Sequence, residues 1–179
     1  MRKVILSAAI TLDGYIARPN GATDFIPMPK SASKAMAEFF STIDTVIMGR
    51  KTAPVSGGSS SFPVQIPTYV FSRSQPPGER DGLIYVNEPP GDLIARVRER
   101  PGKNIFLMGG GELAREFLRA DLIDEISLSV VPLLLGEGIP LFPSDFPQLE
   151  YTLVESNTIS GLLAFKYKRR RATPRDKHR

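Results

Sequence analysis

The sequence predicts a single α/β domain in which a mixed, mostly parallel sheet is flanked by helices and ends in an antiparallel hairpin. Apolar runs of strand length alternate with helical patterns along most of the chain, which is typical of a largely parallel sheet covered on both faces. Residues 150–169 instead contain two alternating runs on either side of Asn157 to Gly161, which indicates a hairpin at the sheet edge. A chain of 179 residues with 41% hydrophobic content is long enough for one core.

The predicted strands are short and apolar. They span residues 3–10, 45–49, 67–72, 82–86, 104–109 and 123–132. Their near-continuous apolar character is that of strands buried on both faces, so we expect most of them to be parallel. The glycine-, serine- and proline-rich segment 53–67 is expected to be a surface loop.

Three amphipathic patterns predict helices between these strands. They span residues 31–43, 90–100 and 111–122. Either Ser31 or Ser33 would cap the first helix, and Asp92 lies near the start of the second. The third helix follows directly on three consecutive glycines, more backbone freedom than a strand-to-helix turn requires. We therefore expect a ligand to approach the backbone there.

Composition narrows the range of functions. The chain has no cysteine and a single histidine, His178, so no metal site is expected. The apolar part of the first segment is short and Asp13 interrupts it, which favours a strand over a membrane-spanning helix. We therefore expect a cytoplasmic protein without a membrane partner.

Positive charge is concentrated at the end of the chain. The formal net charge is +4, but residues 166–179 hold eight Lys or Arg and one Asp, which leaves the remainder mildly acidic. We divide the chain into a domain, residues 1–168, and a basic C-terminal tail, residues 169–179. The tail is expected to be a solvated end, and the alternative is contact with nucleic-acid or membrane phosphates.

Three segments offer groups that bind phosphate, and each follows a predicted strand. They are residues 48–52, 71–78 and 108–113, with the sequences MGRKT, FSRSQPPG and MGGGEL. In an open α/β sheet, ligands bind beyond the carboxyl ends of the strands, where helix amino termini supply unpaired N–H groups. Cationic side chains, hydroxyls and glycine amides together suit a ligand with several phosphates. Neither G-x-G-x-x-G nor G-x-x-x-x-G-K-[ST] occurs, which argues against an ordinary dinucleotide fold or a nucleoside triphosphatase.

The order of four segments resembles the dihydrofolate-reductase-like superfamily. The segments are AAITLDGYIA, VIMGRKT, FSRSQP and IFLMGGGELAREFL. Two stretches are more similar to the riboflavin-biosynthesis reductase branch and its stand-alone bacterial relatives, namely LDGYIA and ADLIDEISLSVVPLLLGEGIPLF. The resemblance covers residues 2–168 and implies that superfamily's three-layer fold, a reductase activity and a homodimer joined through the late strands.

The resemblance also implies an NADPH site. Ala9 would meet the nicotinamide carboxamide, and Ile16 and Ala17 would line the ring. The phosphates would be held by Gly49, Arg50, Lys51 and Thr52, by Ser72 and Arg73 at the 2′-phosphate, and by Gly109, Gly110, Gly111 and Glu112 along the diphosphate. By the same resemblance, the peptide bond between the first two of these three glycines is expected to be cis.

The catalytic acid is the open part of this prediction. Folate reductases carry a carboxylate on the first helix where this chain has Ser33, and the riboflavin-pathway reductase carries a glutamate where this chain has Met108. Asp24 and Glu38 are neighbouring candidates, and Asp13 is either a contact to substrate or cofactor or only a turn residue. These departures predict that the chain is not a physiological folate reductase.

The sequence therefore predicts an NADPH-dependent reductase that moves hydride to a small heterocycle such as a pyrimidine or a pterin. The model for this activity is the 5-amino-6-(5-phosphoribosylamino)uracil reductase of riboflavin biosynthesis. The alternatives are a protein that binds NADP(H) without turnover and a protein that contacts nucleic acid through its basic tail.

Overall fold

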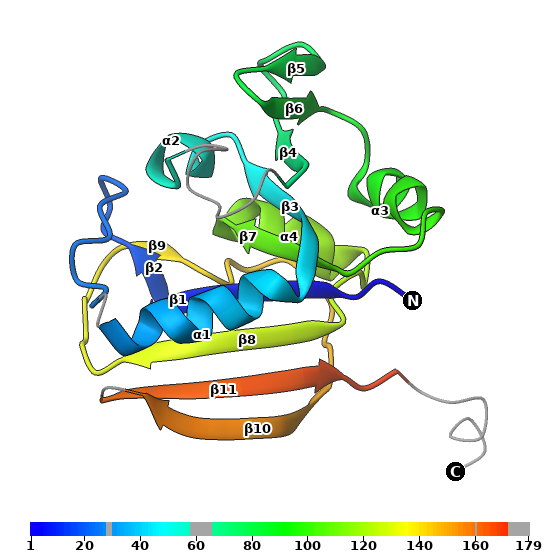
Figure 1. The fold of residues 1–179 in the computed structure, drawn as a ribbon. Helices are drawn as coiled ribbons and strands as arrows, with labels where there is room; N and C mark the ends of the chain where they lie inside the picture. Colours follow the sequence, from blue (N-terminus) through cyan, green and yellow to red (C-terminus); the bar gives the residue numbers. More distant parts are fainter. Residues whose placement is uncertain (28–29, 58–65, 160, 172–179) are drawn as a thin grey trace.

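The main sheet is ordered β10-β11-β8-β1-β7-β3-β4-β6-β5, and β2 and β9 form a separate ribbon (Figure 1). The computed structural model describes residues 1–27, 30–57, 66–159 and 161–171, apart from the side chains of residues 30–33 and 159. The strands are β1 Val4–Thr11, β2 Tyr15–Ala17, β3 Ile43–Gly49, β4 Thr68–Phe71, β5 Gly78–Arg80, β6 Leu83–Val86, β7 Asn104–Gly109, β8 Glu125–Val131, β9 Ile139–Pro140, β10 Tyr151–Ile159 and β11 Leu162–Arg169. The helices are α1 Lys30–Ser41, α2 Thr52–Val55, α3 Pro90–Arg98 and α4 Gly111–Arg119.

The central strands of the sheet are parallel and its edges are antiparallel. From β8 through β1, β7, β3 and β4 to β6, every neighbouring pair runs parallel. β11 runs antiparallel to β8, β10 pairs antiparallel with β11, and β5 does so with β6. This pairing confirms the predicted mixed, mostly parallel sheet and its C-terminal hairpin.

Alternate side chains of β7 face two different layers. Ile105 and Leu107 belong to the larger core, which packs against α3 and α4. Phe106 belongs to a smaller core on the other face, where its ring meets Phe39 of α1 edge to face with centroids 5.0 Å apart, and Phe40 lies beside them. Helices therefore cover both faces of the sheet, which confirms the predicted three layers.

Three local predictions are corrected. α1 begins at Lys30, so Ser31 and Ser33 lie inside the helix rather than at its N-cap, because serine is also tolerated within a helix and its presence alone does not mark the helix start. The expected loop 53–67 begins with α2, and its residues 58–65 lie outside the described residues. β5 was not predicted because its sequence, Gly-Glu-Arg, carries no apolar pattern and the strand exists only through pairing with β6.

None of the described helices is long and apolar enough to cross a membrane.

The first residues of the basic tail are held by the domain. β11 continues to Arg169, whose N–H donates to the carbonyl oxygen of Asp124 at 2.8 Å and whose guanidinium donates to the Asp121 carboxylate at 2.7 Å. Arg171 donates to the carboxylate of Asp124 at 2.7 Å. Residues 172–179 lie outside the described residues.

Asp124 is the centre of this arrangement, and its side chain is only 9% exposed. Besides Arg171, its carboxylate accepts the N–H of Val4 at 2.8 Å and a guanidinium N–H of Arg98 at 2.7 Å. Asp124 therefore joins the start of β1, the end of α3 and the segment after β11. These contacts lie at the amino ends of the parallel strands.

Candidate functional site

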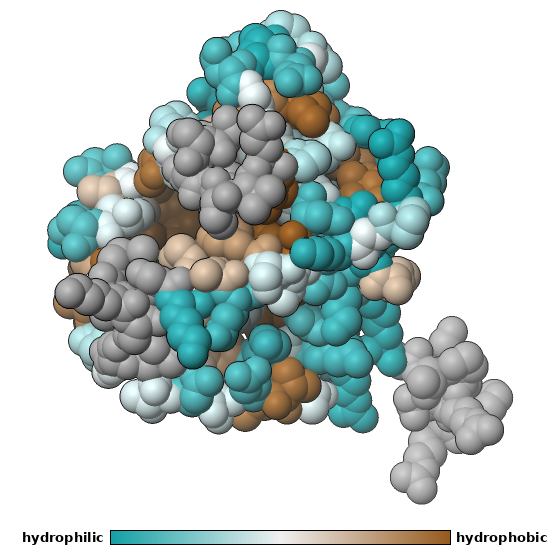
Figure 2. Space-filling model, in the orientation of Figure 1, coloured by the Kyte–Doolittle hydropathy of each residue, from teal (hydrophilic) through white to brown (hydrophobic). Residues whose placement is uncertain are grey.

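The predicted phosphate-binding segments meet at one edge of the sheet. They follow β3, β4 and β7, and β7 lies directly between β1 and β3 in the sheet (Figure 1). The helices that connect the strands lie on different faces of the sheet, α1 and α2 on one face and α3 and α4 on the other. Open α/β sheets bind ligands at the point where the connecting helices switch from one face to the other. Figure 2, in the same orientation, shows tan and brown apolar surface next to the hydrophilic surface of α1.

The glycine turn after β7 has the predicted cis peptide between Gly109 and Gly110. Gly109 has a φ of +95°, a conformation that side chains rarely allow. The N–H of Gly110 donates to Oγ1 of Thr52 at 2.9 Å, which ties the turn to the start of α2. A Cβ placed on Gly49 would lie 3.7 Å from the carbonyl oxygen of Gly109, so the ends of β3 and β7 are in contact.

The third glycine is explained by packing within the protein. A Cβ on Gly111 would overlap the carbonyl oxygen of Pro140 in β9 and would lie 3.2 Å from that of Leu141. Gly111 is buried, whereas Glu112 is exposed in the first turn of α4. The bare backbone that could admit a phosphate is therefore that of Gly109 and Gly110.

Three cationic side chains follow β3 and β4 at the same end of the sheet. Arg50, Lys51 and Arg73 are exposed, and no ion pair links them to any residue in the described ranges. α4 has nine residues, and its N-cap, Gly110, supplies no side-chain hydrogen bond to the first N–H groups of the helix. Cationic side chains and an uncapped helix amino terminus both attract anions.

Ser72 is buried, with 5% of its surface exposed. Its Oγ accepts the N–H groups of Gln75 at 2.9 Å and Ser74 at 3.3 Å, so the hydroxyl shapes the turn that carries Arg73.

Ala9, Ile16 and Ala17, the residues predicted at the nicotinamide, lie in three different surroundings. Ala9 is a partly exposed residue of β1, paired in register with Ser129. Ile16 reaches the glycine turn, since its Cδ1 would lie 3.6 Å from a Cβ placed on Gly110. The side chain of Ala17 is buried in the ribbon of β2 and β9.

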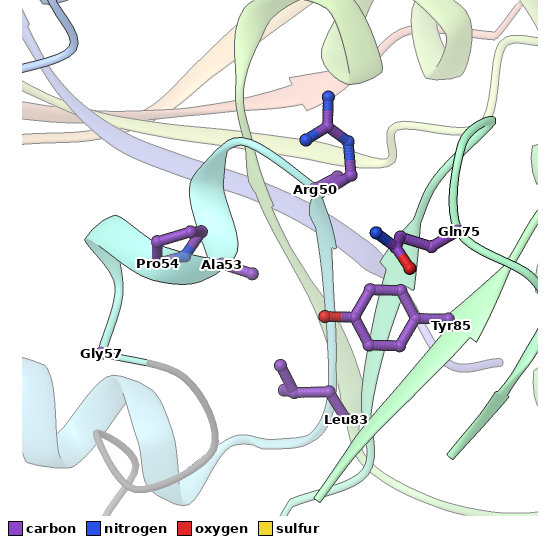
Figure 3. A pocket seen from close by; sticks show the side chains of 7 residues that line it. All are labelled: Arg50, Ala53, Pro54, Gly57, Gln75, Leu83 and Tyr85. Atoms are coloured by element: carbon purple, nitrogen blue, oxygen red, sulfur yellow. The ribbon is translucent and has the colours of Figure 1, made fainter. Parts of the chain in front are cut away.

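A pocket of about 500 Å³ lies beside Arg50 (Figure 3). It is lined by Arg50, Ala53, Pro54, Gly57, Gln75, Leu83 and Tyr85. The guanidinium of Arg80 lies over the ring of Tyr85, 4.4 Å from its centroid. Of the lining residues, sequence reasoning found only Arg50, because Gln75 belongs to an unremarkable turn and Leu83 and Tyr85 fit an ordinary buried strand.

The structure gives Asp24 and Glu38 separate basic neighbours. Asp24 accepts two hydrogen bonds from Arg18, at 2.8 and 3.0 Å, and this contact lowers the pKa of Asp24. Glu38 is exposed on α1 with Lys34 at 4.0 Å. Met108 is partly buried against the core that contains Phe106, and the side chain at position 33 lies outside the described residues. Asp24 lies in the turn that precedes α1, and Glu38 lies on α1 itself.

Asp13 lies in a turn, as one of the two interpretations predicted. The N–H of Gly14 donates to the carbonyl oxygen of Thr11 at 3.0 Å, and the Thr11 hydroxyl donates to the Asp13 carboxylate. The same carboxylate accepts the N–H groups of Leu135 at 3.0 Å and Gly136 at 2.8 Å. The hydrogen bond from Thr11, with those from Gly136 and Leu135, lowers the pKa of Asp13 to about 2 against an opposing effect of desolvation. No sequence pattern signalled this contact between residues so far apart in the chain.

We expect the carboxyl group of Asp13 to titrate at a pH of about 2 rather than at the ordinary 3.8. Because the pKa is lower in the folded protein, the contribution of Asp13 to stability is complete above about pH 4 and is lost as the pH falls toward 2. Carbon NMR of the Asp13 carboxyl group measures this midpoint. Thr11→Val removes the largest cause of the shift and should raise the midpoint, and a wild-type midpoint near 3.8 would contradict the assignment.

Solved structures place the fold in the dihydrofolate-reductase-like class of reductase domains. The "Putative riboflavin biosynthesis protein" from Shewanella sp. PV-4 is 29% identical, with a TM-score of 0.82 and alignment over 94% of this chain and 99% of that one. The diaminohydroxyphosphoribosylaminopyrimidine deaminase/5-amino-6-(5-phosphoribosylamino)uracil reductase from Thermotoga maritima is 16% identical, with a TM-score of 0.74 over 94% of this chain and 56% of that one. The second likeness shows the fold alone.

A family model described as the RibD C-terminal domain matches residues 2–165. The Bacillus subtilis (strain 168) protein named "Uncharacterized protein YwjB" is 38% identical over 144 residues, which are 79% of this chain and 83% of that protein. The chain therefore belongs to the RibD C-terminal domain family and has a reductase-like fold, as the sequence predicted.

Proposed function

We propose that this protein is an NADPH-dependent reductase of a small heterocyclic substrate of the pyrimidine or pterin kind. The observation that carries the proposal is that three exposed cations, Arg50, Lys51 and Arg73, follow parallel strands at the same end of the sheet as the glycine turn and the uncapped start of α4. The Shewanella relative is named a putative riboflavin biosynthesis protein, which supports a heterocyclic substrate.

The residues present fit the chemistry of NADPH. A dinucleotide phosphate needs anion-binding groups at two places, for the diphosphate and for the 2′-phosphate. The backbone of Gly109 and Gly110 and the first turn of α4 would hold the diphosphate, with Thr52 and Arg50 beside them. Arg73 on the turn shaped by Ser72 would take the 2′-phosphate, because a guanidinium binds phosphate oxygens in pairs.

When bound, NADPH would supply the hydride that reduces a C=N or C=O bond of the substrate. The chain's own contribution is to orient the cofactor and to exclude water. Ile16 would lie against the nicotinamide end, and the apolar surface next to α1 would hold the second ring (Figure 2). A reductase of this kind gains most from holding two rings at reacting distance.

The test is to mix the protein with NADPH and a panel of pyrimidines and pterins, and to follow loss of the absorbance of the reduced nicotinamide. Oxidation that depends on one substrate class supports the proposal. NADPH binding without oxidation under any condition favours a protein that holds the cofactor without turnover. The absence of binding overturns both.

Arg73→Ala is expected to weaken NADPH binding and to leave NADH binding nearly unchanged. The two cofactors differ by one phosphate, so the preference must come from groups that bond to that phosphate. Two charge-assisted bonds of about 1.5–3 kcal/mol each, discounted for exposure, give about tenfold to a few hundredfold discrimination. Titration of both cofactors at fixed ionic strength measures it, and Arg170→Ala, at an exposed arginine after β11, is the control. Equal losses for both cofactors would remove Arg73 from the 2′-phosphate site.

We also propose a homodimer that covers the edge strand β10. This strand is nine residues long and ends the sheet, and the exposed fractions of Leu153, Val154 and Leu163 are 50%, 54% and 50%. A long apolar edge is an aggregation hazard unless it is covered. Light scattering at micromolar concentration should give twice the monomer mass, and Leu153→Lys should shift the protein toward monomer. A wild-type monomer would contradict the proposal.

A further inference from the structure

Two loops at the carboxyl ends of β1 and β8 are joined by hydrogen bonds. The two strands pair as far as Thr11 and Val131. Beyond them, the N–H of Leu12 donates to the carbonyl oxygen of Leu133 at 2.9 Å. The Asp13 carboxylate then accepts two consecutive backbone N–H groups of the second loop. The exposed side chain of Asp13 therefore accepts two of these three hydrogen bonds between the loops.

Each loop continues into one strand of the β2–β9 ribbon. Ala17 of β2 pairs with Ile139 of β9, and the N–H of Leu141 donates to the carbonyl oxygen of Gly14 at 3.0 Å. Both strands of the ribbon are very short, so the ribbon contributes few hydrogen bonds of its own. Its position depends on the loops that lead into it.

The ribbon forms the wall of the glycine turn. Ile16 of β2 lies against Gly110, and Pro140 of β9 lies against Gly111 at the start of α4. Arg73 is at the far side of the site, because β4 lies three strands from β1 in the sheet, a distance of roughly 14 Å. A change in the ribbon would therefore act at one end of the site and not at the other.

We propose that Asp13 is a positioning residue for the nicotinamide end of the cofactor site. Its carboxylate holds the loops after β1 and β8 together and thereby fixes the β2–β9 ribbon, with Ile16, against the glycine turn. The inference rests on the proposed function. Without this carboxylate the two exposed loops regain conformational freedom, and the fraction of molecules with a formed wall falls. The apparent affinity for a ligand that needs the wall falls by the same factor.

The test compares two ligands on three variants. NADPH spans the whole site, whereas adenosine 2′,5′-bisphosphate occupies only the end that contains Arg73. Asp13→Ala is expected to weaken NADPH binding about 3–10-fold, with the bisphosphate affinity unchanged within about twofold. Asp13→Asn should fall in between, because its amide oxygen still accepts a hydrogen bond. Glu137→Gln removes an exposed carboxylate from the same loop and should leave both affinities unchanged.

Hydrogen exchange provides a readout that does not depend on a ligand. The amides of Leu135 and Gly136 should exchange faster in Asp13→Ala than in the wild type. Equal loss of both ligands in Asp13→Ala, or no loss of either, would overturn the positioning role while leaving the proposed function in place. A wild-type protein that binds neither ligand would overturn the proposed function and the positioning role together.

Discussion

Replacing Asp124 by alanine is expected to lower the free energy of unfolding by about 3 kcal/mol. The variant leaves the guanidinium groups of Arg98 and Arg171 without their shared acceptor and leaves the N–H of Val4 without its bond. Removing one member of a buried ionic group costs about 3–5 kcal/mol, because the remaining charges stay desolvated. The low end applies because the Arg98 and Arg171 side chains are 21% and 44% exposed and can regain water.

Urea denaturation measures this loss as a lower midpoint with an unchanged slope. Glu155→Ala is the matched control, because Glu155 pairs with Lys166 in an exposed ion pair that contributes about 1 kcal/mol or less. Asp124→Asn should lose less than alanine, since its amide oxygen can still accept one of the three bonds. Equal stabilities of the Asp124→Ala and Glu155→Ala variants would contradict the prediction that the buried Asp124 carboxylate contributes more stability than an exposed ion pair.

Gly111→Ala is expected to destabilise the protein and to weaken cofactor binding together. The new methyl group would overlap the carbonyl oxygen of Pro140 in β9. Because the clash is with a backbone atom, no side-chain rotation can relieve it, and β9 or the start of α4 would have to shift. Overpacking of this kind costs about 1–3 kcal/mol or more. This cost exceeds the gain of about 0.5–1 kcal/mol that alanine brings to a helix in place of glycine, so the free energy of unfolding should fall.

Gly91→Ala is the control for this substitution. Gly91 lies in the first turn of α3, and a Cβ placed there meets nothing within 4 Å. The same change should therefore be neutral or slightly stabilising at Gly91. Thermal unfolding of the two variants side by side separates the clash from helix propensity, and similar melting temperatures would contradict the packing role of Gly111.

The sequence was sufficient to predict the layers of the fold and to place the candidate phosphate-binding segments at one end of the sheet. Strand-length apolar runs and glycine-rich turns are local signals, so the central strands and the hairpin could be predicted from them, whereas the cis bond between Gly109 and Gly110 was predicted from the family resemblance. Arg50 and Arg73 could also be placed together, because parallel strands end at a common edge.

The remaining features depend on contacts between distant parts of the chain. In the sequence, Gly111 resembles a phosphate-binding glycine, and only the structure shows that Pro140 packs against it. Asp13 resembles an ordinary turn residue, and only the structure shows that its carboxylate accepts the N–H of Gly136. Charge counting could not show that Arg171 bonds to Asp124, because the number of basic residues does not indicate their partners. Packing selects these contacts, and no local pattern encodes them.

The central position of β1 has a consequence for how the protein is made in the cell. β1 is synthesised before every other strand of the sheet, yet its sheet neighbours are β7, where Val4 pairs with Ile105, and β8, where Thr11 pairs with Val131. At about 5–20 residues per second, a ribosome needs roughly 5–25 s to complete both neighbours after β1. The nascent chain therefore carries β1 as an unpaired apolar strand until β7 has been made, and the central sheet can assemble only when β8 has also left the ribosome.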